Sequence, residues 1–164
     1  MRRLAATKLA IFFLIATGVI SCNILGPRSN EMPVPVSNTY EYWVTGGFAG
    51  SKEHTVIDST GLAKYTSQFS PGSAITTYTY RMTESELDTL KVAFESANFH
   101  SLDSVYQAAQ RIMDGFDMSV TWNAGNQSKT VAVEANASVP SGLSSLLRAL
   151  NNVNTAIQSK GQKS

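Results

Sequence analysis

The hydrophobic pattern of the chain changes its period at Thr83, and this change limits what the chain can fold into. Between Tyr40 and Met82, apolar and β-branched residues alternate with polar ones in the segments YEYWVT, HTVID, LAKYTSQ and ITTYTYRM. Such alternation is typical of strands that bury one face. Beyond Thr83, apolar residues recur three or four positions apart, which is the spacing of a helix. The sequence therefore predicts a four-stranded meander followed by a helix.

The start of this helix carries its own signal. Thr83 can cap the helix while Glu86 reaches back to the backbone N–H of the cap, an arrangement known as a capping box. The predicted helix ends near Asn98, and its apolar stripe consists of Leu87, Leu90, Phe94 and Ala97. The segment that follows is ambiguous, and a short helix around SVYQAAQ (residues 104–110) is one interpretation.

The C-terminal third of the chain predicts a hairpin and a second helix. Alternation places Phe116, Met118, Val120 and Trp122 on one face of a strand, and Val131, Val133 and Ala135 on one face of the next. Pro140 then introduces a helix with the stripe Leu143, Leu146, Leu147, Leu150, Val153 and Ile157. The order of elements predicts a single α+β domain over residues 39–160, with an antiparallel sheet of about five to six strands and two helices packed on one face.

The N-terminus has the features of a bacterial lipoprotein leader. Residues 1–21 begin with the basic residues Arg2, Arg3 and Lys8 and continue with the apolar run LAIFFLIATGVI, which predicts a signal peptide. A transmembrane helix is the alternative, but it needs about 20 apolar residues. The junction VISC resembles the lipoprotein cleavage box, in which a small residue precedes the cysteine that receives the lipid. Cys22 is the only cysteine of the chain, so we predict lipidation at Cys22 rather than an incidental thiol.

The predicted mature protein is anchored in the bacterial cell envelope and carries little net charge. Residues 22–38 contain three prolines and no apolar periodicity, so after the lipidated cysteine they predict an extended tether. Asn23 replaces the aspartate that often retains lipoproteins at the inner membrane, which favours the outer membrane where the envelope has two. Without residues 1–21, ten Lys and Arg (13 minus 3) face twelve Asp and Glu, a net charge of −2. Nucleic acid is therefore not an expected partner.

The sequence contains no pattern that predicts an enzyme. A zinc site usually needs three protein ligands, and the chain has only two histidines, His54 and His100, and no HExxH motif. The stretch HSLDS that begins at His100 assembles residue types of a catalytic triad, but a triad is a geometry built from distant segments. We expect no catalytic residues, no metal and no cofactor.

One loop combines glycines with a large apolar residue, and it is the predicted partner-binding segment. Gly46, Gly47, Phe48, Ala49 and Gly50 lie between two predicted strands. A reversal gains conformational freedom from glycine, but it gains nothing from an aromatic ring. Two alternatives remain: the ring of Phe48 folds back onto the core, or it is held out for a partner.

Three later segments accompany the glycine loop, namely DGFD at residues 114–117, KTV at 129–131 and VPSGL at 139–143. In this order, the four segments resemble the emfourin family of protealysin inhibitors, over residues 40–157. The resemblance implies an α+β fold and inhibition of a thermolysin-like zinc metalloprotease, with the catalytic zinc belonging to the partner. Such proteases generally favour a large apolar residue just after the scissile bond, a role that Phe48 would fill. The alternative is an envelope lipoprotein that uses the same scaffold as a structural or adaptor binding module.

Overall fold

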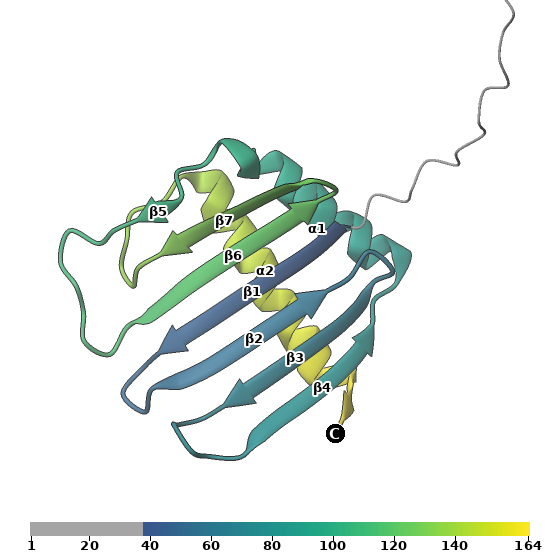
Figure 1. The fold of residues 1–164 in the computed structure, drawn as a ribbon, viewed down its shortest axis with the longest axis horizontal. Coiled ribbons are helices and arrows are strands. Elements are labelled where there is room, and N and C mark those ends of the chain that lie inside the picture. The colour runs from purple at the N-terminus through teal and green to yellow at the C-terminus, as the bar shows by residue number, and fades with distance from the viewer. Residues whose placement is uncertain (1–37) are drawn as a thin grey trace, which may run out of the picture. The chain divides into compact units, whose positions relative to one another are not determined.

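The computed structural model describes residues 38–164, which form one eight-stranded sheet and two α-helices (Figure 1). The strands lie in the order β5-β7-β6-β1-β2-β3-β4-β8, and only the β5–β7 pair is parallel. Their bounds are β1 Asn38–Gly46, β2 Ser51–Ile57, β3 Leu62–Gln68, β4 Ile75–Arg81, β5 Val105–Tyr106, β6 Phe116–Ala124, β7 Gln127–Val133 and β8 Gln162–Lys163. The helices are α1 Glu84–Ser96 and α2 Ser141–Lys160, with a 3₁₀ turn, η1, at Phe99–Ser101.

The predicted α+β class is confirmed, but the predicted number of strands is too low. Two strands of two residues each lie at the edges of the sheet. The β5 strand is one of them, and it forms where a short helix around residues 104–110 was one interpretation; that interpretation is wrong. There, the backbone N–H of Ala132 donates to the carbonyl of Ser104 at 2.9 Å, and that of Glu134 donates to the carbonyl of Tyr106 at 2.9 Å. Hydrogen bonds to β7 therefore hold this segment in an extended conformation. A strand of two residues is too short to show the alternating hydrophobic pattern from which strands are predicted.

Helix α1 begins as the sequence predicts. The backbone N–H of Glu86 donates to the Thr83 hydroxyl at 3.2 Å, and the backbone N–H of Thr83 donates to the Glu86 carboxylate at 2.8 Å. The capping box is thus complete. The helix buries Leu87, Leu90 and Phe94 and ends at Ser96, with Ala97 as its C-cap.

Both helices pack on the same face of the sheet, and a single core lies between the helices and the sheet. Figure 1 shows α2 running diagonally behind the strands. Buried residues of both helices share one cluster with strand residues that include Tyr40, Tyr42, Ile57 and Val120. The predicted stripe of α2 is buried except at Val153, which is half-buried. The polar Asn154 is buried instead, because its side-chain oxygen accepts a hydrogen bond of 2.6 Å from the Thr55 hydroxyl.

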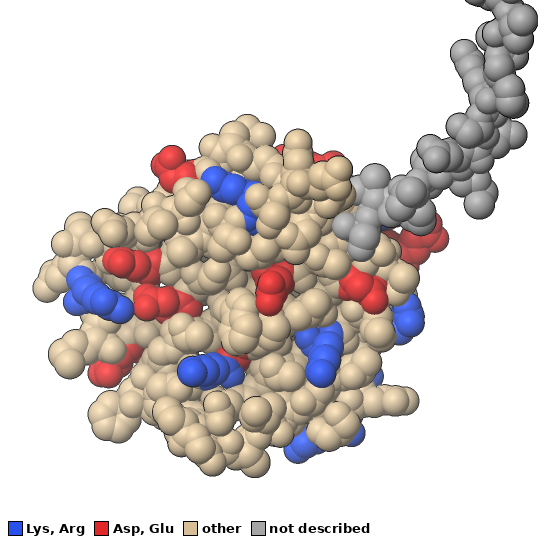
Figure 2. All heavy atoms as spheres, viewed as in Figure 1, with Lys and Arg blue, Asp and Glu red and all other residues tan. Residues whose placement is uncertain are grey.

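The opposite face of the sheet is not covered by a helix (Figure 1), and it carries scattered charged side chains (Figure 2). Positive and negative side chains are interspersed over it, without a large area of one sign. At its centre the rings of Trp43 and His54 stack at a centroid distance of 3.6 Å, and His54 Nε2 lies 2.7 Å from Glu41 Oε1. This face therefore lacks the basic footprint that a nucleic-acid interface requires.

Among residues 38–164, no helix is both long and apolar enough to cross a membrane. The predicted signal peptide (1–21), the lipidation site Cys22 and the tether up to residue 37 lie outside the described residues. They remain predictions.

The capping carboxylate of Glu86 is expected to make stability depend on pH. The N–H of Thr83, and then contacts with Lys160 and Tyr80, lower the pKa of Glu86 from 4.5 to about 2. A carboxyl whose pKa is lower in the folded state stabilises the fold above its unfolded pKa, and this stabilisation is lost as the pH falls from 4.5 toward 2. Replacing Glu86 by alanine should cost about 1 kcal/mol near pH 7 and progressively less below pH 4.5, in urea unfolding across this pH range. Glu84, in the same turn, makes no side-chain hydrogen bond with the described residues, so Glu84→Ala is the control. A cost for Glu86→Ala that stays constant with pH would contradict this account.

Candidate protein-binding loops

Three loops meet at one end of the sheet, opposite the end where β1 begins (Figure 1). They are the β1–β2 loop (residues 47–50), the β3–β4 loop (69–74) and the β5–β6 loop (107–115). Ten large apolar residues are exposed among residues 38–164, and six of them lie in or beside these loops. We call these six the apolar rim: Phe48, Phe69, Ile75, Ile112, Met113 and Phe116.

The structure decides between the two alternatives for Phe48. Its side chain is 94% exposed, so the ring is held out rather than packed onto the core. The predicted segment supplies the turn: Gly47 and Gly50 have φ values of +70° and +67°, and the Gly50 N–H donates to the Gly47 carbonyl at 3.0 Å. Residues with side chains rarely adopt these angles, so the two glycines hold Phe48 and Ala49 at the tip of a defined turn.

Glycine also allows the β1–β2 loop to touch the β5–β6 loop. The Gly47 N–H donates to the carbonyl of Gly115 at 3.1 Å. A Cβ atom at Gly46 would lie 2.2 Å from that same oxygen, and a Cβ atom at Gly47 would lie 2.8 Å from the Phe116 ring. The paired glycines of the sequence motif are therefore needed at this contact, and the ring of Phe116 lies against Gly47.

The β3–β4 loop completes the rim on the other side. A Cβ atom at Gly50 would make an ordinary contact, 3.5 Å, with the ring of Pro71. The Ser73 hydroxyl donates to the carbonyl of Ser70 at 2.8 Å and accepts from the Ser70 N–H at 3.0 Å, which closes the turn. This closed turn carries Phe69, whose side chain is 75% exposed.

The β5–β6 loop is also tied down at both of its ends. The Ala108 N–H donates to the Glu134 carboxylate at 3.0 Å, and the Ala135 N–H donates to the Asp117 carboxylate at 2.8 Å. Between these ends lies Met113, which is 98% exposed.

The apolar rim is suited to binding and not to chemistry. Contiguous exposed apolar side chains are typical of interaction sites, because leaving such area in water costs about 25 cal/mol per Å². None of the six residues of the rim has a titratable or nucleophilic group. The two histidines lie elsewhere: His54 stacks on Trp43, and His100 packs 4.5 Å from the ring of Trp122. Within residues 38–164, no three side chains of His, Cys, Asp or Glu are placed to hold a metal ion.

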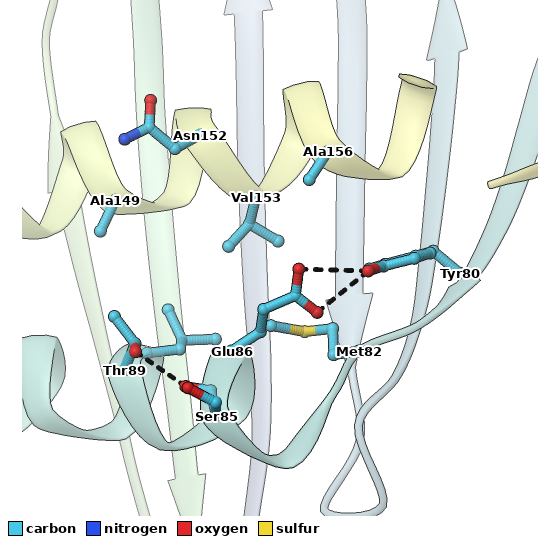
Figure 3. A pocket seen from close by; sticks show the side chains of 10 residues that line it. Tyr80, Met82, Ser85, Glu86, Thr89, Ala149, Asn152, Val153 and Ala156 are labelled. Atoms are coloured by element: carbon cyan, nitrogen blue, oxygen red, sulfur yellow. Dashed lines mark hydrogen bonds between the residues drawn. The ribbon is translucent and has the colours of Figure 1, made fainter. Parts of the chain in front are cut away.

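A hollow lies between α1, α2 and the end of β4 (Figure 3). It has a volume of about 280 Å³, and its apolar wall includes Met82, Leu90 and Val153. Its one carboxylate, Glu86, accepts hydrogen bonds of 3.0–3.1 Å from the Tyr80 hydroxyl. This carboxylate also serves the helix cap, so the hollow offers no unsatisfied charge to a ligand.

The sequence singles out the β1–β2 loop and the DGFD end of the β5–β6 loop, but the exposure of Phe69 and Met113 was not predicted. Phe69 stands in the turn-rich segment FSPGSA, where the argument applied to Phe48 could have identified it. Alternation places Phe116 on the same face as Met118, and the structure confirms this, but Phe116 is 48% exposed at the end of the sheet. Nothing in the sequence marks Met113 as exposed.

One protein family matches the chain. The family model described as a domain of unknown function, DUF6438, matches residues 54–154, which is more than half of the 164 residues. The match includes the β3–β4 and β5–β6 loops and begins after the β1–β2 loop. No curated protein matches the chain.

Proposed function

We propose that this chain, which belongs to the DUF6438 family, is a lipid-anchored envelope protein that inhibits a thermolysin-like zinc metalloprotease by binding it. The observation that carries the proposal is the presentation of Phe48, 94% exposed, at the tip of a glycine turn. The resemblance of this turn to that of the emfourins supplies the class of partner.

The turn has the properties that an inhibitory loop needs. Phe48 enters the apolar pocket that accepts the residue just after a scissile bond, and the protease contributes the zinc ion. Because the Gly47–Gly115 hydrogen bond and the glycine conformations hold the loop, little conformational entropy is lost on binding. The main chain on either side of Phe48 is nearly free of side chains, so it can approach the partner closely.

The position of the loop suits an anchored protein. The predicted tether joins β1 at Asn38, and β1 spans nine residues before it reaches the glycine turn. At about 3.3 Å per residue, roughly 27 Å separate the two ends of this strand. A partner can therefore engage the rim without contacting the attachment point of the tether.

The first test is direct inhibition. We expect the protein to slow cleavage of a peptide substrate by thermolysin or by a thermolysin-like protease of the host bacterium, and to hydrolyse nothing itself. Bovine serum albumin at the same concentration controls for substrate competition. An absence of inhibition over a panel that includes the host's own proteases would contradict the proposal.

A specific observation favours a second candidate, an adaptor module that binds another envelope protein. The DUF6438 match begins at residue 54, so the matched family pattern does not include the glycine loop. A neighbouring gene for a thermolysin-like protease would favour inhibition. A genome without any gene for such a protease would favour the adaptor.

The lipid anchor is tested separately at Cys22. We expect Cys22→Ala to release the protein from the membrane fraction, because stable anchoring requires the acyl chains that the cysteine would carry. Ser29→Ala, in the predicted tether, should remain in the membrane fraction like the parent. Retention of Cys22→Ala in the membrane, together with a parent that carries no lipid by mass spectrometry, would show that the leader itself is the anchor.

A further inference from the structure

We infer that the partner contacts all three loops of the apolar rim, so that Phe69 and Met113 flank Phe48 in one convex surface that enters the partner's cleft. This inference rests on the proposed function and names the shape of the partner's site and two further binding residues. The four segments that carry the sequence resemblance include neither Phe69 nor Met113.

The first reason is exposure at all three loop tips. Phe48, Phe69 and Met113 are 94%, 75% and 98% exposed, so each side chain extends away from its own loop. Each belongs to a different hairpin or crossover connection of the sheet. Exposed side chains at three loop tips fit a concave site better than a flat one.

The second reason is that the loops behave as one unit. The β1–β2 loop is bonded to the β5–β6 loop through Gly47 and Gly115, and it approaches the β3–β4 loop at Gly50 and Pro71. A partner that receives Phe48 deeply is therefore brought against the neighbouring loops as well.

The third reason is the width of the rim. It extends from β6 across β1, β2 and β3 to β4, which is four strand spacings. At about 4.8 Å per spacing the rim is roughly 20 Å wide, the length of about six residues of extended peptide. A protease cleft that holds an extended substrate has these dimensions.

Charge favours a protein partner over a lipid surface. The β1–β2 and β3–β4 loops contain no lysine or arginine. In the β5–β6 loop the one cation, Arg111, lies 3.6 Å from the Asp117 carboxylate, and Asp114 adds a negative charge beside Met113. Loops that insert into bacterial membranes combine apolar side chains with basic ones, which anionic headgroups attract.

Photo-cross-linking tests which molecule each loop touches. The full chain carries p-benzoylphenylalanine in place of Phe48, Phe69 or Met113, and in place of Val92 on α1 as an exposed apolar control. Each protein is placed in vesicles of phosphatidylethanolamine and phosphatidylglycerol, and thermolysin and the host's thermolysin-like proteases are added in turn. In parallel, Phe69→Ala and Met113→Ala are assayed for inhibition, with Val92→Ala as the matched control.

We expect cross-links to the protease from positions 48, 69 and 113 and none from position 92. Phe69→Ala and Met113→Ala should each weaken inhibition about fivefold or more, and Val92→Ala should not change it. Cross-links from position 48 alone, with full inhibition by Phe69→Ala and Met113→Ala, would overturn the three-loop surface and leave the proposed function standing. Cross-links from 69 and 113 to lipid or to a second copy would also overturn it. If no protease is cross-linked and none is inhibited, both proposals are overturned.

Discussion

Replacing Phe48 by alanine is expected to weaken inhibition of a thermolysin-like protease about thirtyfold, which corresponds to roughly 2 kcal/mol of binding free energy. Thermal unfolding should be unchanged, because the ring is 94% exposed and contributes almost nothing to the core. Surface substitutions of this kind usually change stability by less than about 0.5 kcal/mol. Melting and inhibition should be measured on the same preparation, so that a folding defect cannot be mistaken for a binding defect.

Two companion variants sharpen this measurement. Phe48→Leu keeps a large apolar side chain and should retain most of the inhibition, while Val92→Ala removes exposed apolar surface from α1 and should retain all of it. A large loss of melting temperature in Phe48→Ala would mean that the ring supports the fold. If the parent inhibits and Phe48→Ala inhibits equally well, Phe48 does not lie in the binding site.

Replacing Phe94 by alanine is expected to lower the free energy of unfolding by about 3–5 kcal/mol. Phe94 is fully buried at the centre of an aromatic cluster, with ring centroids 4.8 Å from Tyr40, 5.1 Å from Phe99 and 5.3 Å from Trp122. Because these neighbours come from η1 and two strands, β1 and β6, the vacated space cannot be filled by a single side-chain movement. Urea unfolding at pH 7 gives the change directly.

The control for this variant lies two residues away. Val92 is exposed on the same helix, so Val92→Ala shares the helix but not the core and should stay within about 0.5 kcal/mol of the parent. A loss below about 1.5 kcal/mol in Phe94→Ala would mean that the aromatic cluster closes around the cavity.

Most of the fold could be predicted because it is recorded in local patterns. Alternation identified the six long strands, and the capping box of Thr83 and Glu86 fixed the start of α1. The strands β5 and β8 could not be predicted. They hold two residues each, and they are extended because an adjacent strand offers hydrogen-bond partners.

The candidate site was predictable only in part. The glycines of the β1–β2 loop predict a tight turn, because glycine adopts positive φ angles without a steric cost. Whether Phe48 faces the core or solvent depends on what lies above and below the turn. No local pattern contains that information, because the orientation of Phe48 depends on tertiary packing.

Local sequence patterns are enough to predict the α+β class, the strands and helices of ordinary length, and the glycine turn, because short-range sterics and hydrophobic period govern all three. The sequence also predicts the signal peptide and the lipidation of Cys22. The loops of Phe69 and Met113 lie on either side of the Phe48 loop as a result of the folded strand order, since β6 follows β1 by some seventy positions in sequence yet pairs with it directly. The order of strands in a sheet is set by long-range pairing and burial. It is this order that gathers three separate loops into one apolar rim.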